Sequence, residues 1–336
     1  MEEARLTEVD EFIYNKEIRP LLPERVFDAH SHLHKSSLHP GSKDLSNPNN
    51  NLEKIDMSCL QNWWRVLFPD SKVSGLVLGH PRPLSLQDIK AENEFLAENT
   101  SAHKDCRFSI LASPQLSAEQ MEKQILELKP TGLKPYMVFA QVPEKNLASI
   151  TQMIPEEQIA LADKYGLTIT LHVAKPRGMA DDENLDEITR LTKQYPNCNF
   201  ILAHCGRCFI TPNAEDMLKR LPVAENLWLD TSAVCDIGVF FLLLQEYDTS
   251  RILFGTDLVE AAAFRGTYVR LGMTWDMCTA QMVFREKSLH KIRATFAAYE
   301  NLSAMLYAAK FSKTSSKDLE NIFYNNAAGL FGIDKS

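Results

Sequence analysis

Four histidines and one aspartate stand at the ends of short apolar runs, where strand-like sequence gives way to polar sequence. They are His30, His32, His172, His204 and Asp257. Alternate side chains of a strand face the same side, so His30 and His32 point together and could chelate one metal ion. Hydrogen-bonded core histidines would not need to fall at the ends of three separate runs. The placement therefore predicts a functional cluster and favours metal binding.

Eight such runs recur along the chain and alternate with helix signals. As candidate strands they are Val26–His30, Val73–Gly79, Arg107–Ala112, Gly132–Tyr136, Leu167–His172, Asn199–His204, Leu227–Thr231 and Ile252–Asp257. Helix starts are indicated by Ser85, Ser117 and Pro155, and Gly166 stands where a helix would end. Eight strands alternating with helices predict an α/β fold, a single (β/α)8 TIM barrel. A doubly wound sheet is disfavoured, because no glycine-rich phosphate loop follows the first strand.

The extra length of the chain falls outside the barrel repeat. Residues 1–25 are expected to form an N-terminal extension that packs on the barrel, and residues 26–336 the barrel domain itself. A Ser/Asn/Pro-rich stretch at 35–51 predicts a long loop after the first strand. The stretch 258–317 predicts an insertion after the eighth strand with helices of its own, for example Ser288–Ala309. Both follow the carboxyl end of a strand, so we expect them to shape the site.

The composition excludes several classes of protein. The 336 residues carry 36 basic and 44 acidic side chains, a net charge of −8, which argues against a nucleic-acid binder that relies on a global basic field. No apolar run approaches the roughly 20 residues needed to span a bilayer. The charged start shows no apolar leader. Seven cysteines, an odd number, fit reduced thiols in the cytoplasm.

Five motifs along the chain resemble the amidohydrolase superfamily, and within it the amidohydrolase-related branch of metal-dependent hydrolases and decarboxylases. The motifs are Phe27-Asp28-Ala29-His30-Ser31-His32, Thr170-Leu171-His172, Leu202-Ala203-His204-Cys205-Gly206-Arg207, Gly255-Thr256-Asp257 and Asn325-Asn326-Ala327-Ala328-Gly329-Leu330-Phe331. The resemblance covers nearly the whole chain. It implies one divalent metal, most often zinc, whose ligands are His30, His32, His172 and Asp257. It also implies that His204 and Asp257 handle protons.

The chemistry of these side chains agrees with the resemblance. Neutral imidazoles and one carboxylate suit Zn²⁺ and leave a position for water, whose pKa zinc can lower from about 15.7 to about 7. Asp257 could then accept the proton of that water, and His204 could hydrogen-bond it or polarise a substrate oxygen. Asp28 shares the inward parity of His30, and two roles are open for it: an acceptor that fixes a histidine tautomer, or a buried polar plug.

Four further side chains are candidate substrate contacts: Lys134, Tyr136, Arg207 and Arg265. Family members with two metals carry a carboxylated lysine on the fourth strand, whereas other branches keep a plain lysine there. We expect Lys134 to be a plain lysine and the chain to hold one metal. The guanidinium of Arg207 could grip a substrate carboxylate with two hydrogen bonds. Cys205 and Cys208 form a Cys-x-x-Cys motif, but the chain has no second such pair, so we expect no zinc ribbon or redox site.

Two activities share these ligands. The leading expectation is a metal-dependent hydrolase in which metal-activated water attacks a small amide, lactone or ester carbonyl, with Asp257 moving the proton. The alternative is a metal-dependent decarboxylase of an aromatic or unsaturated carboxylic acid. A barrel that has lost its chemistry is disfavoured, because all the proposed ligands are present. We expect a small-molecule substrate, with carboxylates among the candidates, a cytoplasmic location, no nucleic-acid or membrane partner, and a homodimer as one expected assembly.

Overall fold

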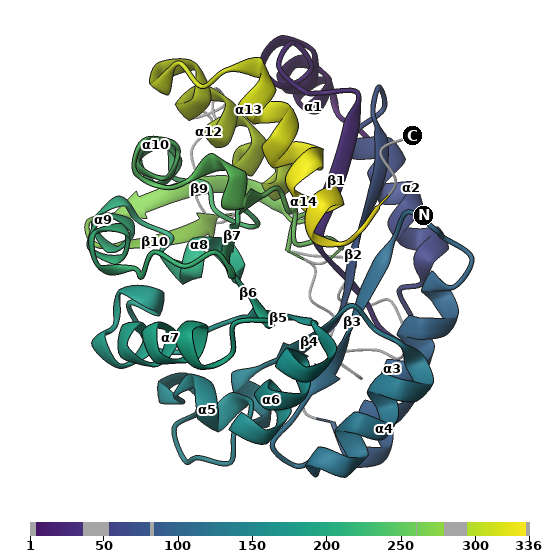
Figure 1. Cartoon of the computed structure of the whole chain (residues 1–336). Coiled ribbons are helices and arrows are strands. Elements are labelled where there is room, and N and C mark those ends of the chain that lie inside the picture. The colour runs from purple at the N-terminus through teal and green to yellow at the C-terminus, as the bar shows by residue number, and fades with distance from the viewer. Residues whose placement is uncertain (1–4, 36–53, 81–83, 260, 279–293, 334–336) are drawn as a thin grey trace.

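Eight parallel strands form one sheet in which spatial order follows sequence order. The computed structural model describes residues 5–35, 54–80, 84–259, 261–278 and 294–333. The strands are β1 Arg25–Leu33, β2 Lys72–Gly79, β3 Arg107–Ala112, β4 Gly132–Pro135, β5 Thr168–Leu171, β6 Asn199–Leu202, β7 Leu227–Asp230 and β8 Ile252–Leu253. The chain after β8 returns to β1, where the Asp257 amide donates to the His30 carbonyl at 2.7 Å. This confirms the predicted single (β/α)8 barrel (Figure 1).

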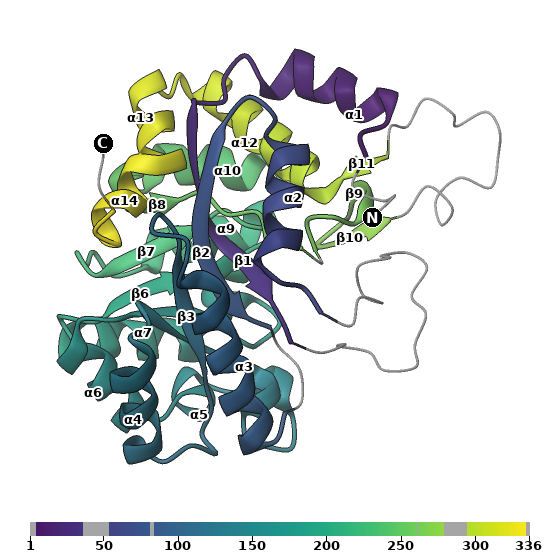
Figure 2. The same ribbon diagram turned by 90° about the vertical axis from the view of Figure 1, so that its right-hand side faces the viewer.

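Helices connect the strands and cover the outside of the barrel (Figures 1 and 2). The longer ones are α2 Met57–Leu67, α3 Leu86–Thr100, α4 Ala118–Leu128, α6 Glu156–Tyr165, α7 Asp182–Gln194, α9 Thr211–Arg220, α10 Ile237–Glu246 and α12 Ala297–Ser312. The shorter segments are α1 Glu8–Ile13, η1 Tyr14–Ile18, η3 Met137–Phe139, η4 Lys145–Leu147, α5 Ile150–Met153, η5 Gly178–Ala180, α8 Ala203–Arg207, η6 Thr249–Arg251, α13 Ser316–Glu320, η8 Asn321–Asn325 and α14 Asn326–Leu330. The predicted helix signals are confirmed: Ser85 and Ser117 form capping boxes, and Gly166 ends α6 in the left-handed conformation.

The alternation of side chains along β1 decides which residues reach the barrel interior. Phe27 and Ala29 are fully buried inside the barrel, where they share an apolar cluster with Leu76 of β2, Ile201 of β6 and the closing helix α14. The rings of Phe27 and Phe331 stack with centroids 5.5 Å apart. Burial of one such side chain contributes roughly 1.5–3 kcal/mol. A bulge between Asp28 and Ser31 then shifts the register of β1 against β2, so that His30 and His32 also face inward, whereas Asp28 below the bulge bonds to Trp64 on the outer helix α2.

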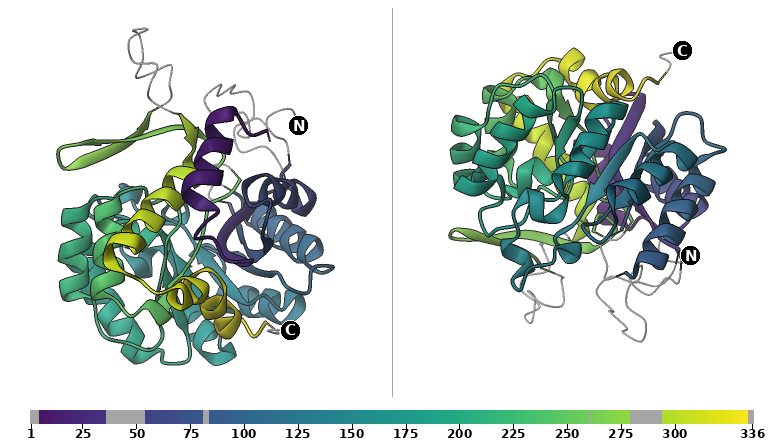
Figure 3. Two further views of the ribbon diagram at one scale, coloured as in Figure 1. Left: turned by 90° about the horizontal axis from the view of Figure 1, so that it is seen from above. Right: turned by 60° about the horizontal axis from the view of Figure 1, so that its bottom comes forward.

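The N-terminal segment packs on the barrel beside α12 (Figure 3). The buried carboxylate of Asp10 accepts hydrogen bonds from Thr295 Oγ1 at 2.7 Å and from Arg265 Nη1 at 2.5 Å. Arg265 also donates to the Arg5 carbonyl at 2.6 Å and lies 3.7 Å from the centre of the Phe296 ring. The guanidinium of Arg265 therefore joins the N-terminal segment to the insertion, and its predicted role as a substrate contact gains no support from these surroundings.

The insertion after β8 differs from its predicted helical character. It contains an antiparallel hairpin of β9 Arg265–Leu271 and β10 Thr274–Cys278, and a short strand β11 Thr295–Phe296. The alternation of β-branched and aromatic residues favours strands here, and Gly272, with a φ of +62°, supplies the left-handed first position of a two-residue turn. The prediction of a helix over Ser288–Ala309 is wrong at its ends, because α12 begins at Ala297 and ends at Ser312. Residues 288–293 lie outside the described part.

Two other expectations concern parts of the chain that the structure covers incompletely. The predicted loop at 35–51 lies outside the described residues except for Lys35. Within the described ranges, none of the helices has the length and apolar character that crossing a membrane requires.

Candidate metal centre

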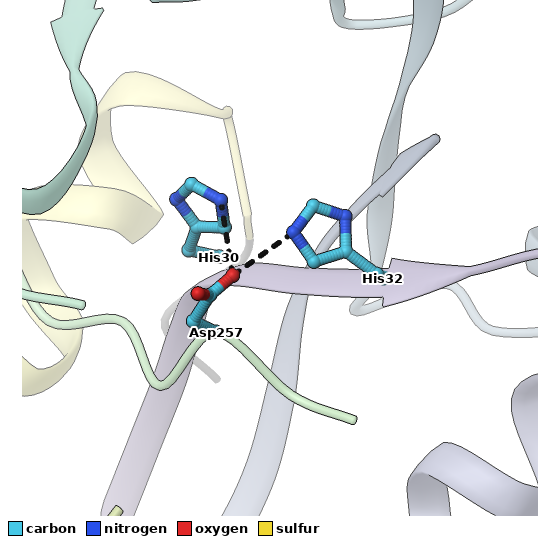
Figure 4. Close-up of side chains that lie close together, drawn as sticks. All are labelled: His30, His32 and Asp257. Atoms are coloured by element: carbon cyan, nitrogen blue, oxygen red, sulfur yellow. Dashed lines mark hydrogen bonds and ion pairs between the residues drawn. The ribbon is translucent and has the colours of Figure 1, made fainter. Parts of the chain in front are cut away.

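Three of the predicted ligands converge at the carboxyl end of the barrel. His30 and His32 come from β1, and Asp257 follows β8 in the neighbouring segment. Asp257 Oδ1 lies 3.0 Å from His32 Nε2 and 3.6 Å from His30 Nε2 (Figure 4). Each residue offers one ligand atom, and these atoms lie within 4.8 Å of one another. A glycine allows this approach, since a Cβ on Gly255 would stand only 2.9 Å from the Cβ of His30.

His204 and His172 extend the cluster on one side. The ring of His204 lies 4.7 Å from that of His30, and the ring of His172 lies 5.2 Å from that of His204. His172 is thus one ring further out than the three converging residues. Its Nδ1 is buried without a hydrogen-bond partner among the described residues, as expected of an atom available to a ligand. Its role as the fourth metal ligand stays a prediction.

The protonation states of the cluster suit a divalent cation. Burial lowers the pKa of His30 to about 3, and the Lys134 charge acts in the same direction. Burial also lowers the pKa of His172 and of His204, so these imidazoles are neutral and can donate lone pairs. Burial alone would raise the pKa of Asp257, but the hydrogen bond from His32 and the nearby histidines hold it well below its usual value. Neutral imidazoles with one ionised carboxylate fit a divalent metal ion.

Lys134 adds a buried cation to the floor of this cluster. Its side chain on β4 is fully buried, and Nζ lies 3.5 Å from His30 Nε2. Burial lowers its pKa to about 8, while the negative charges of Asp230 and Asp257 act in the opposite direction. The ammonium also stands 5.0 Å from the centre of the Tyr136 ring, whose hydroxyl donates to the Gly79 carbonyl at 2.8 Å.

Asp230, at the carboxyl end of β7, is a functional candidate that the sequence analysis missed. Its Oδ2 lies 2.8 Å from His30 Nδ1. Asp230 thus contacts the ring nitrogen of His30 that faces away from the candidate metal ligands, and it orients the ring. The available signal was its position as a carboxylate at the end of the seventh predicted strand, the same criterion that singled out Asp257.

Asp28 has the second of the two roles considered for it. It accepts hydrogen bonds from Thr256 Oγ1 at 2.6 Å, the Thr256 amide at 2.8 Å and Trp64 Nε1 at 3.0 Å. Its only bond to His30 is from the backbone amide, at 3.2 Å. Burial raises the pKa of Asp28 to about 6, against the effect of these bonds. Asp28 is therefore a buried polar plug that joins β1 to Trp64 on α2, and it does not set a histidine tautomer. Its predicted inward parity with His30 is wrong, because the bulge between Asp28 and Ser31 interrupts the alternation.

The chain turns sharply where the sixth strand was expected to reach His204. β6 ends at Leu202, and residues 204–207 all have positive φ, between 49° and 66°. The left-handed conformation costs roughly 1–2 kcal/mol for each residue other than glycine, and Gly206 is the only glycine in the turn. Residues held in such strain cluster at functional sites. The hydrogen bond from the His204 amide to Asp230 Oδ1, 2.9 Å long, anchors the start of the turn.

Arg207 ends this turn close to His172. Its Nη1 donates to the Val173 carbonyl at 2.9 Å, while Nε is buried without a hydrogen-bond partner among the described residues. Burial lowers the pKa of Arg207, and no ion pair within the described ranges includes it. A guanidinium whose Nε has no hydrogen-bond partner among the described residues can donate to a substrate, which is consistent with the predicted carboxylate contact.

The two cysteines of the Cys-x-x-Cys motif, one in the left-handed turn and one just after it, have a structural role. Cys205 and Cys208 are buried, and all seven cysteines of the chain are unpaired. Burial raises the pKa of both thiols, so they stay protonated and unreactive. This agrees with the expectation that the Cys-x-x-Cys motif is not a redox or zinc site.

Three aromatic side chains form a wall against His204 that the sequence analysis also missed. The ring of Phe209 stacks on His204 with centroids 5.9 Å apart, and Trp275 lies 4.7 Å beyond Phe209. Tyr268 stacks on Trp275 at 6.2 Å and donates to Asp236 Oδ2 at 3.2 Å. Trp275 and Tyr268 belong to the β9–β10 hairpin, where helices were expected. We call Phe209, Trp275 and Tyr268 the aromatic wall.

On the other side of the cluster, the ring of His80 stands 5.1 Å from His32.

Comparisons with solved structures find the same fold in several enzymes. The chain is similar to 2,6-dihydroxybenzoate decarboxylase from Rhizobium, with a TM-score of 0.55 and 15% identity, covering 93% of this chain and 99% of that one. It is similar to a dihydroxybenzoic acid decarboxylase from Polaromonas with bound manganese and the inhibitor 2-nitroresorcinol, with a TM-score of 0.56, 15% identity and coverage of 93% and 98%. The 5-carboxyvanillate decarboxylase from Sphingomonas paucimobilis matches with a TM-score of 0.51, 11% identity and coverage of 93% and 100%. At these identities the likeness shows the fold alone.

The comparison with family models is more specific. A model described as Amidohydrolase matches residues 87–333, which is well over half of the chain. A comparison with curated protein sequences finds no significant match. The motifs, the barrel and the family model agree, and the chain belongs to the amidohydrolase family.

Proposed function

We propose that this chain is a metal-dependent decarboxylase that removes carbon dioxide from an aromatic carboxylic acid. The observation that carries the choice is the aromatic wall, which begins directly on the ring of His204. A flat aromatic surface beside the histidine cluster suits a flat aromatic substrate better than a small amide or lactone. The names of the three similar structures, all decarboxylases of aromatic acids, support the same choice. The proposal therefore prefers the alternative from the sequence analysis to the hydrolase.

The negative charge of such a substrate suits the cations of the site. Lys134 is buried beside His30, and Arg207 is partly buried beside His172. Neither forms an ion pair with a carboxylate within the described ranges. Removal of a charged group from water is costly, so both groups favour an anionic ligand. We assign Lys134 and Arg207 to binding and orienting the substrate.

The divalent metal, when bound, would supply positive charge that holds substrate oxygens in place. His30, His32 and Asp257 would hold it, with His172 as the fourth expected ligand. The reaction also needs a proton at the ring carbon that bears the carboxylate. Once that carbon is protonated, the bond to the carboxylate breaks, its electron pair restores the aromatic ring, and carbon dioxide leaves. We assign the proton transfer to Asp257 and His204: either group would first take up a proton, from solvent or from a substrate hydroxyl, and then deliver it to that carbon.

Product analysis tests this proposal. The purified chain, loaded separately with Zn²⁺ and Mn²⁺, would be incubated with hydroxybenzoic acids and with amides and lactones of similar size. We expect release of carbon dioxide from at least one hydroxybenzoic acid and formation of the corresponding phenol. Cleavage of an amide or lactone without release of carbon dioxide would overturn the proposal in favour of the hydrolase.

A further inference from the structure

The carboxylate of Asp230 makes four hydrogen bonds, and two of them are with the histidines His30 and His204. The carboxylate is fully buried at the end of β7. Its Oδ2 faces His30 Nδ1 at 2.8 Å. Its Oδ1 accepts from the His204 amide at 2.9 Å, the Ser232 amide at 3.1 Å and Ser232 Oγ at 2.5 Å. Four donors around one carboxylate keep it ionised despite its burial.

Ser232 connects the Asp230 carboxylate to the ring of His204. Ser232 Oγ lies 2.8 Å from His204 Nδ1, and the Ser232 carbonyl lies 3.1 Å from the same nitrogen. The serine hydroxyl has one proton, which it donates to the Asp230 carboxylate, so toward His204 its oxygen can only accept. A carbonyl oxygen is also only an acceptor. Both neighbours of His204 Nδ1 are therefore acceptors, and this nitrogen must carry the proton.

The same reasoning applies to His30. Its Nδ1 faces an ionised carboxylate, which only accepts, so His30 is also protonated at Nδ1. Both imidazoles consequently have an unprotonated Nε2 that carries a lone pair. On His30 this atom faces the candidate metal ligands, 3.6 Å from Asp257 Oδ1.

We propose that Asp230 is a positioning residue that fixes the tautomers of both His30 and His204, directly for the first and through Ser232 for the second. One buried carboxylate thereby leaves Nε2 unprotonated on both rings, so that His30 Nε2 can bind the metal and His204 Nε2 can accept a proton. The functional importance of these tautomers rests on the proposed function, in which His30 binds the metal and His204 transfers a proton. The tautomers themselves are properties of the metal-free chain.

The two connections can be separated by substitution. In Asp230→Asn, the amide oxygen would face the three donors at the Oδ1 position, which leaves the NH₂ group facing His30 Nδ1. His30 would then be protonated at Nε2, the wrong nitrogen for the metal, while the connection to His204 would persist. In Ser232→Ala, the connection to His204 is weakened and the contact of Asp230 with His30 remains. The two variants therefore serve as controls for each other.

The experiment is long-range ¹H–¹⁵N NMR of the metal-free chain with ¹⁵N-labelled histidine, together with metal affinity measured by competition with a chelator. In the unsubstituted chain we expect both His30 and His204 to be protonated at Nδ1. Asp230→Asn should move the His30 proton to Nε2 and weaken metal binding by about 10–100-fold. Ser232→Ala should leave the His30 tautomer and the metal affinity unchanged.

Two results would overturn the inference. One is an Nε2-protonated His30 in the unsubstituted chain, a measurement that does not depend on whether any variant folds. The other is unchanged metal affinity in a folded Asp230→Asn protein. Neither readout involves a substrate, so a chain that shows the expected tautomers but releases no carbon dioxide would refute the proposed function and leave the role of Asp230 intact.

Discussion

The imidazoles of His30, His172 and His204 are neutral because they are buried, and the carboxylates beside them are ionised because they are hydrogen-bonded. Burial lowers the pKa of His30, His172 and His204, while the contact with His32 keeps the pKa of Asp257 low. This division of charge makes lone pairs available at neutral pH. It also makes Asp257 the charged member of the ligand set, and the chemistry should depend on that charge.

Replacement of Asp257 by Asn tests this dependence. The amide keeps the shape of the side chain but removes its charge and its ability to take up a proton. We expect kcat to fall by about 10²–10⁴-fold. The thermal unfolding curve should stay close to that of the unsubstituted chain, because Asp257 is partly exposed and packs little apolar surface. Retained activity in a folded Asp257→Asn protein would contradict the proposed role.

Lys134 makes the stability of the metal-free chain depend on pH. Its pKa is lowered from 10.5 to about 8, so between these values the unfolded chain binds more protons than the folded one. Stability should therefore increase as pH rises from about 8 to about 10.5, by up to about 3 kcal/mol for this group. Lys134→Met should lack this increase. Denaturant unfolding of both proteins across the range gives the comparison, and parallel pH profiles would contradict it.

The two arginines singled out in the sequence should behave differently. Arg207 has no carboxylate partner among the described residues, whereas Arg265 is occupied by Asp10. Arg207→Gln should raise KM for a carboxylate substrate by roughly tenfold or more, the loss of one charged hydrogen bond. Arg265→Gln should leave KM unchanged and lower the unfolding free energy by about 2–3 kcal/mol, because it leaves Asp10 buried without its cation. The reverse pattern would restore Arg265 as a substrate contact.

At the scale of elements, the candidate metal ligands lie at the ends of strands, and the insertion after β8 contributes Trp275 and Tyr268 to the aromatic wall. The ends of β1 and β7 and the turns after β6 and β8 bring five side chains together. The β9–β10 hairpin then places Trp275 against Phe209, which itself lies on His204. The hairpin is thus the element on which substrate choice should depend.

Truncation of Trp275 tests the hairpin. Trp275→Ala removes the ring that packs on Phe209, and we expect KM for an aromatic substrate to rise by roughly 10-fold, on the order of 1.4 kcal/mol of lost binding. Metal affinity should not change, because no ligand is touched. Met273→Ala at the exposed tip of the hairpin is the matched control and should leave KM unaltered. Equal effects of the two substitutions would show that the wall does not contact the substrate.

The sequence predicted the strands better than their ends. Period-two alternation marked β1 and the shared direction of His30 and His32, but it could not predict the bulge between Asp28 and Ser31 that interrupts the alternation of this strand. It could not predict the left-handed turn at His204, because the His204 amide donates a hydrogen bond to Asp230, a residue 26 positions later. The hairpin was missed for a similar reason: its strands are held by pairing with each other and with Thr295–Phe296.

At the scale of the whole molecule, the barrel was predictable and the identity of the reaction was not. Eight recurring runs and the order of the motifs specify the closed sheet, which the structure confirms. Hydrolysis and decarboxylation need the same ligands, so the choice between them rests on the surroundings of the cluster. Those surroundings are the aromatic wall, Lys134 and Arg207. They come from three separate parts of the chain, and only the fold brings them together.

The most direct test of the central claim is the reaction carried out in D₂O with a hydroxybenzoic acid, using the metal-loaded chain, the chain stripped of metal and the Asp257→Asn protein. The account predicts metal-dependent release of carbon dioxide and a phenol with one deuterium at the carbon that carried the carboxylate. The stripped chain and the Asp257→Asn protein should give little or none of this product. Equal rates with and without metal, or a phenol without deuterium at that carbon, would contradict it.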